Sequence, residues 1–156
     1  MIFRPIHLKK DLSVVRQFRR DSFVESFGND DGFDSDDYIA WLKENIRIFP
    51  SGFVMAEEHG RPVGQIELSI RRYEGRLIGY VHLYYLIPEE RGEGKGRYLL
   101  AYSEDFFRWH RVKEYHLRVS PTNTRAVKFY KKSGLREVGT ELNGKVVRLN
   151  KEIEID

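Results

Sequence analysis

The stretch that decides the fold is LYYLIPEERGEGKG, residues 83–96, in which an apolar run ends at a proline and is followed by three glycines. The run from Val81 to Ile87 is short and rich in aromatic and branched residues, and Pro88 closes it, which is typical of a buried strand. Beyond the glycines, apolar residues recur at helical spacing: Tyr98, Leu99, Tyr102, Phe106 and Trp109. The sequence therefore predicts a strand, a tight turn and then a helix.

Gly92, Gly94 and Gly96 fall at this turn from strand to helix. Glycine permits positive φ and lets a ligand approach the backbone closely. The start of a helix also presents unpaired N–H groups and a positive dipole end, which suit a phosphate. Neither a P-loop nor a dinucleotide fingerprint fits the glycine spacing. The glycines alone thus leave two interpretations, a phosphate site or a turn in which they serve packing only.

The composition is that of an ordinary soluble protein, with 156 residues of which 40% are hydrophobic and 33% charged. No apolar segment reaches the roughly 18 residues that span a bilayer, and no signal peptide is visible, so we expect a cytoplasmic protein without a membrane partner. Cysteine is absent and the five histidines lack ligand spacing, so we expect no disulfide and no metal. The net charge of +3 is scattered, which argues against a nucleic-acid partner and favours a small polyanionic ligand.

The order of the remaining patterns predicts one α+β domain over residues 1–156. Helices are expected at residues 11–27, 37–48, 96–110 and 124–134, and strands at residues 2–6, 53–58, 62–73, 76–87, 112–120, 136–142 and 145–153. Most neighbouring strands should pair in antiparallel hairpins. Only the strand–helix–strand passage from Val81 to Val119 should be parallel, because its helical crossover returns the chain in the same direction. We therefore predict a central mixed, mostly antiparallel sheet with helices on both faces.

Two motifs make the chain resemble the GNAT superfamily, the acetyl-CoA-dependent N-acetyltransferases. Residues 91–96, RGEGKG, match the family signature [RQ]-x-x-G-x-[GA] in the predicted position after the fourth strand. Farther along, VSPTNTRAVKFYKKSGL, residues 119–135, matches V-x-x-x-N-x-x-A-x-x-F-Y-x-x-x-G. The order of elements resembles the family from Met1 to about Ile153. The resemblance implies a GNAT-type fold and acetyl-CoA as cosubstrate.

The resemblance also implies where coenzyme A lies. Its pyrophosphate would be held by backbone N–H groups at residues 92–96, with added charge from Lys95 and Arg97. The fourth and fifth strands would splay apart, and the coenzyme arm would pair with free backbone groups in the gap. Asn123 is carried over as a contact to that arm, although a helix cap is the alternative. The expected coenzyme-binding residues are Tyr84, Leu86, Arg91, Gly92, Gly94, Lys95, Gly96, Arg97, Asn123 and Tyr130.

Acetyl transfer needs a polarised carbonyl and a proton for the departing thiolate. The resemblance assigns the first task to a backbone N–H near Leu86 and the second to the phenol of Tyr130. A role for Tyr130 as a core aromatic is the alternative. The carboxylates that some relatives use as a base are missing, because Tyr80 and Arg118 stand at those positions.

Strand alternation suggests a substitute for the missing base. Tyr80, His82 and Tyr84 should share one face of their strand, and pairing through the turn at residues 74–75 should bring Glu67 opposite His82. A carboxylate there would raise the pKa of the imidazole, which makes His82, with Glu67, a candidate catalytic pair. One alternative is that these residues form only a polar face of the sheet. A register slip or a bulge would undo the pairing of Glu67 with His82. Another alternative is that water alone removes the proton.

The sequence says least about the acceptor, the molecule that would receive the acetyl group. In GNAT-like folds the connection between the first two helices borders the acceptor site, and here it carries Asp30, Asp31, Asp34, Asp36 and Asp37. Such a rim would steer a cationic amine, whereas a solvated capping loop is the alternative. The resemblance implies direct attack by a primary amine of a small molecule or peptide in a ternary complex. Homodimers are frequent in that family, and a non-catalytic acyl-CoA sensor of the same fold is the alternative function.

Overall fold

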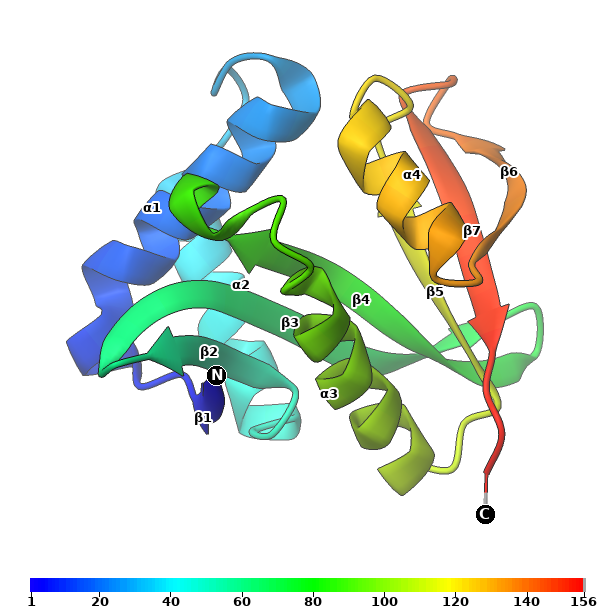
Figure 1. Ribbon diagram of the computed structural model, residues 1–156, viewed down its shortest axis with the longest axis horizontal. Coiled ribbons are helices and arrows are strands. Elements are labelled where there is room, and N and C mark those ends of the chain that lie inside the picture. The colour runs from blue at the N-terminus through cyan, green and yellow to red at the C-terminus, as the bar shows by residue number, and fades with distance from the viewer. Residues whose placement is uncertain (156) are drawn as a thin grey trace.

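The computed structural model describes residues 1–155, and its centre is a seven-stranded sheet in the order β1-β2-β3-β4-β5-β7-β6 (Figure 1). The strands are β1 (Ile2–Pro5), β2 (Phe53–Glu58), β3 (Arg61–Tyr73), β4 (Arg76–Leu86), β5 (Glu114–Val119), β6 (Arg136–Glu141) and β7 (Val146–Glu152). The helices are α1 (Leu8–Phe27), α2 (Ser35–Ile48), α3 (Gly96–Trp109) and α4 (Thr124–Lys132), with a 3-10 turn, η1, at Pro88–Glu90. The predicted α+β architecture with a mostly antiparallel sheet is confirmed.

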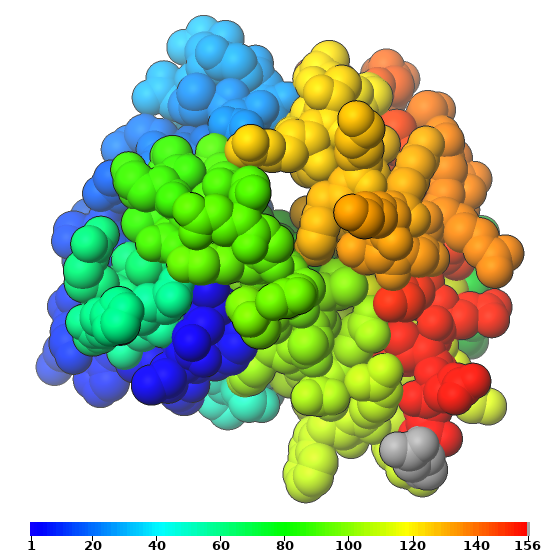
Figure 2. Space-filling view, viewed as in Figure 1, coloured from blue at the N-terminus to red at the C-terminus, as the bar shows by residue number. Residues whose placement is uncertain are grey.

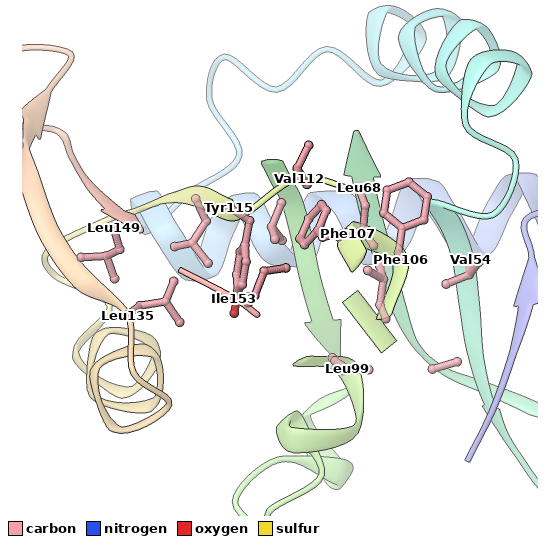
Figure 3. Close-up of a cluster of buried hydrophobic side chains, with 14 of the residues drawn as sticks. Val54, Leu68, Leu99, Phe106, Phe107, Val112, Tyr115, Leu135, Leu149 and Ile153 are labelled. Carbon is pink, nitrogen blue, oxygen red and sulfur yellow. The ribbon is translucent and has the colours of Figure 1, made fainter. Parts of the chain in front are cut away.

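Two apolar cores lie on opposite faces of this sheet. The larger packs α3 against the sheet, and Phe107, Tyr115 and Leu68 are among its buried members (Figure 3). The smaller lies under α1 and α2 and includes Val15 and Leu42. Because β2 alternates its side chains between the two cores, both faces of the sheet are covered.

The parallel pairing of β4 with β5 is confirmed, and it is short. The two strands pair at three positions, from Gly79 opposite Tyr115 to Val81 opposite Leu117. Beyond these positions β4 runs on to Leu86 without a partner on that side. Figure 1 shows the result as two arms, with α1 and the arrowhead end of β4 on the left and β5, β6, β7 and α4 on the right. The sheet therefore opens where the glycine turn begins.

A bulge in β4 changes which side chains share a face. Val81 pairs with Leu68 and Leu83 pairs with Glu67, so His82 is the extra residue of β4. Val81 lies in the core beside α3, whereas Leu83 lies in the core under α1 and α2. The predicted regular alternation is wrong beyond this point, because the inserted residue shifts every later side chain to the other face.

Candidate active site

A cleft of about 550 Å³ follows the gap between β4 and β5. Residues of α1, of the glycine turn and of α4 line it, and Arg91 of the turn pairs with Glu25 of α1. Figure 2 shows an opening between the green turn and the gold start of α4. The predicted site residues that line the cleft are His82, Tyr84, Leu86, Arg91, Gly92, Gly94, Lys95, Gly96, Asn123 and Tyr130. Glu67 and Arg97 do not line it.

The glycine turn has the geometry of an anion site. Gly92 and Gly94 have φ values of 80° and 76°, which L side chains rarely adopt. Within residues 1–155, the N–H groups of residues 92–95 donate to no acceptor. Gly96 has a different reason to be glycine, because a Cβ there would stand 2.9 Å from the ring of Phe129. Two glycines thus shape the turn, and the third lets α3 approach α4.

The two cations expected at this turn are engaged elsewhere. Lys95 Nζ lies 2.8 Å from Glu58 and also contacts Glu90. Arg97 donates to the hydroxyl of Tyr98 at 3.1 Å and stays outside the cleft. Carboxylates therefore balance the charge of Lys95, and Arg97 lies outside the cleft lining.

Arg125 of α4 is a cation that lies beside the glycine turn. Its Nη2 atom lies 3.6 Å from the point where a Cβ on Gly92 would stand. No carboxylate pairs with Arg125 among the residues that the structure describes, and its side chain lines the cleft. The sequence could have indicated Arg125. A cation in the first turn of a helix is unfavourable beside the positive end of the helix dipole, so its presence there suggests a bound anion.

The end of β4 offers unpaired backbone groups to the cleft. Ile87 N donates to Val63 O at 2.9 Å, so Leu86 and Gly64 form a pair without direct hydrogen bonds. Tyr84 and Ile66, two residues away along each strand, also form a pair without direct hydrogen bonds. The N–H groups of Tyr84 and Leu86 therefore point away from β3, toward the gap that β5 leaves open.

Arg91 and Asn123 both make contacts within the protein. Arg91 Nε donates to Leu86 O at 2.8 Å, which anchors the end of β4. Asn123 Oδ1 accepts from Ala126 N at 3.3 Å, so Asn123 is the N-cap of α4, as the alternative interpretation allowed. Their direct contribution to coenzyme binding stays a prediction.

Tyr130 faces the cleft from α4, with its ring centroid 6.1 Å from that of Tyr84. Its hydroxyl makes no hydrogen bond with the described part of the chain. Burial raises the pKa of Tyr130 above its ordinary value, so the phenol keeps its proton at neutral pH. The side chain is thus placed and protonated as a proton donor would be.

The predicted pair of Glu67 and His82 does not form. The bulge sets Glu67 opposite Leu83, and the Glu67 carboxylate is fully buried on the α1 and α2 side. It accepts hydrogen bonds from Arg19 Nη1 at 3.0 Å, Tyr38 Oη at 2.5 Å and Gln65 Nε2 at 3.0 Å. The expectation that Glu67 would raise the pKa of the imidazole is therefore wrong.

His82 has a different partner and the opposite pKa shift. Its Nε2 atom lies 2.7 Å from the hydroxyl of Ser69, a buried residue of β3. Burial lowers the pKa of His82 to about 3, and the positive charges of Arg71 and Arg19 act in the same direction. The Nδ1 atom has no hydrogen-bond partner within residues 1–155. His82 is thus a neutral imidazole at the cleft, and its Nδ1 atom is available to a ligand.

The acidic loop lies outside the cleft. Asp34 accepts from Asp37 N and caps α2, Asp36 pairs with Arg16, and Asp30 lies 3.8 Å from Arg20. None of the five aspartates lines the cleft. The expected acidic rim of the acceptor site is therefore not found in the cleft, and the loop serves mainly to begin α2.

Comparison with known proteins decides the family. Residues 13–135 match the Acetyltransferase (GNAT) family. The chain belongs to the GNAT family. An uncharacterized N-acetyltransferase of Archaeoglobus fulgidus is 30% identical over 106 residues, which cover 66% of this GNAT chain and 70% of that protein.

Solved structures agree with the GNAT fold. A protein of Pyrococcus horikoshii OT3 superposes with a TM-score of 0.76 at 25% identity, over 99% of each chain. The PaiA N-acetyltransferase of Thermoplasma acidophilum, solved in complex with coenzyme A, gives a TM-score of 0.75 at 23% identity, over 97% of this chain and 98% of that one. Within residues 1–155, none of the helices is long and apolar enough to cross a membrane.

Proposed function

We propose that this GNAT protein transfers an acetyl group from acetyl-CoA to a primary amine of a small molecule or peptide, with both substrates bound at once. The observation that carries the proposal is the cleft between β4 and β5. It joins unpaired N–H groups at the glycine turn to a half-buried tyrosine and an uncharged imidazole. Such a cleft can bring two ligands together from its two sides, as direct attack requires.

The coenzyme side fits a molecule that carries phosphates on a polar arm. The N–H groups of residues 92–95 and the guanidinium of Arg125 would hold the pyrophosphate. The free N–H of Tyr84 would pair with the arm as a missing strand would, which leaves the N–H of Leu86 for the thioester carbonyl at its end. When bound, acetyl-CoA supplies the activated acetyl thioester. The relative from Thermoplasma acidophilum was solved with coenzyme A, which supports this assignment.

Three groups of the chain then divide the chemistry. The free N–H of Leu86 is a donor for the developing negative charge on the carbonyl oxygen. Tyr130 gives its proton to the departing sulfur. His82 accepts the amine proton on Nδ1, directly or through water, while Ser69 accepts a hydrogen bond from Nε2–H and so fixes the tautomer. Because this imidazole is a weak base, it acts on an amine that reaches the cleft already neutral.

The test is release of free thiol from acetyl-CoA against a panel of amino acids, short peptides, diamines and aminoglycosides, with calorimetry of coenzyme binding. We expect turnover with one acceptor class, and loss of most turnover in Tyr130→Phe with coenzyme binding retained. Tight coenzyme binding without turnover on any acceptor would favour a non-catalytic acyl-CoA sensor. Absence of coenzyme binding would overturn the proposed role of the glycine turn.

A further inference from the structure

We infer that the acceptor carries a carboxylate within a few bonds of its reacting amine, and that Arg71 and Arg118 recognise this group beside Tyr80. The inference rests on the proposed function, because it assigns the acceptor side of the same cleft. It departs from the sequence-based expectation of a cationic acceptor. The reason is the positive charge around Tyr80: Tyr80 and Arg118 line the cleft next to His82, and Arg71, which does not line it, lies against the Tyr80 ring.

Three guanidinium groups gather around Tyr80. Arg71 lies 4.7 Å from the ring centroid of Tyr80, and Arg148 lies 5.9 Å from it. Arg118 lines the cleft, and its positive charge acts on the Tyr80 hydroxyl together with those of Arg71 and Arg148. Tyr80 itself lines the cleft two residues before His82.

This cluster has too few acids to balance it. Glu141 accepts from Arg118 Nε at 2.8 Å and from Arg148 Nε at 2.7 Å. Arg71 has no carboxylate partner within residues 1–155. Three cations against one carboxylate leave two positive charges in excess. A cationic acceptor would be repelled at this point, whereas a carboxylate would complete the cluster.

The geometry places such a carboxylate close to the amine. The rings of Tyr80 and His82 lie 4.8 Å apart, and two strand residues span about 7 Å. The Tyr80 hydroxyl makes no hydrogen bond in the described chain, so it is a further donor. Of the residues that line the cleft, Glu25 is the one carboxylate, and Arg91 lies 3.4 Å from it. An α-amino acid, or a peptide that begins with an acidic residue, has the required spacing.

The experiment compares acceptors that differ in one charge. Tripeptide amides that begin with glutamate or glutamine share the same α-amine and shape, and a second pair is alanine and alaninamide. The first pair tests a side-chain carboxylate and the second an α-carboxylate, and kcat/KM is calculated per neutral amine because an α-carboxylate raises the pKa of the amine. We expect kcat/KM to favour the acidic member of at least one pair by about tenfold, the scale of one charge-assisted hydrogen bond. A diamine should be the poorer acceptor.

In the variant Arg71→Gln, the ratio of kcat/KM for the acidic acceptor to kcat/KM for its uncharged partner should fall to near one. Arg72→Gln is the matched control. Both residues are exposed and neighbouring in β3, and their side chains point to opposite faces, so both variants lose one charge but only Arg71 faces Tyr80. Equal kcat/KM within both pairs, a preference for the diamine, or equal effects of the two variants would overturn the inference.

A further measurement separates failure of this inference from failure of the proposed acetyl transfer. If no acceptor is acetylated, the same pairs are titrated calorimetrically into the protein with saturating coenzyme A. Tighter binding of an acidic member, lost in Arg71→Gln, supports the inference without any turnover. Equal binding within each pair, or none, overturns it.

Discussion

Replacing Arg19 with methionine should destabilise the protein in a pH-dependent way. Arg19 Nη1 bonds to the fully buried carboxylate of Glu67 at 3.0 Å and to the carbonyl oxygen of His82 at 3.2 Å. Methionine keeps much of the apolar length but leaves Glu67 without a cation. Tyr38 and Gln65 remain as its hydrogen-bond donors. The variant therefore isolates the charge of Arg19.

The magnitude follows from the proton that Glu67 would take up. Burial already raises the pKa of Glu67, and Arg19 opposes that rise. Without Arg19, folding at pH 7 must protonate a carboxyl whose unfolded pKa is about 4.3, which costs at most about 3.7 kcal/mol at 1.36 kcal/mol per unit. The wild type already carries part of this cost, so we expect a loss of about 2–3 kcal/mol at pH 7. A raised folded pKa means that the penalty grows as pH rises, and at pH 5 it should be about 1 kcal/mol or less.

The assay is urea unfolding at pH 5, 7 and 8 of the wild type, Arg19→Met, Glu67→Gln and the double variant. The double variant should recover most of the loss, with a coupling of at least about 1.5 kcal/mol. Arg20→Met is the control, because Arg20 and its partner Asp30 are both exposed and 3.8 Å apart, and it should cost less than about 1 kcal/mol. A loss for Arg19→Met that is equal at all three pH values would refute the reasoning, since lost packing does not depend on pH.

Four further predictions concern the cleft. Tyr130→Phe should lower kcat roughly 100-fold in a thiol-release assay while the coenzyme Kd stays within about threefold, and an unchanged kcat would remove Tyr130 as the proton donor. Gly94→Ala, at φ 76°, and Gly144→Ala, at φ 81°, should each cost about 1 kcal/mol in unfolding, but calorimetry should find weaker coenzyme binding only for Gly94→Ala. Arg125→Ala should weaken coenzyme binding about tenfold at low salt and less at high salt, whereas Lys132→Ala should have little effect. Because the folded pKa of His82 is about 3 and the unfolded value about 6.5, stability should fall as pH drops through this window, and His82→Gln should reduce that fall in acid unfolding curves.

The parts of the fold that the sequence predicted are those set by local chemistry. Apolar periodicity located the helices and strands, and the turn at residues 92–96 followed from glycines that adopt positive φ. The parallel pairing of β4 and β5 followed from the length of the crossover. Each of these signals lies within one segment of the chain, so a single sequence can reveal it.

The parts that were missed depend on contacts between distant segments. Nothing in residues 76–86 marks His82 as the extra residue, because a bulge is defined by the strand that lies opposite. The Glu67 carboxylate is satisfied by Arg19, 48 residues away, and a strand pattern cannot foresee a partner on a helix. The acidic loop at residues 30–37 gave a wrong prediction of the acceptor site because its contacts are local. Three of its five carboxylates bind nearby groups: Asp34 caps α2, Asp36 pairs with Arg16 and Asp30 lies near Arg20.

The bulge links the corrected and the confirmed parts of this site. Without the extra residue, regular alternation would keep Tyr84 on the face of Tyr80 and would turn Leu83 and Tyr85 toward α3. With it, one strand presents Tyr80 and His82 to the acceptor side and then turns Tyr84 toward Tyr130. The carbonyl of His82, at the bulge, accepts from Arg19, the same side chain that balances Glu67. Glu67, first considered as a partner of the base, therefore acts one step away: it holds Arg19, and Arg19 holds the backbone of His82.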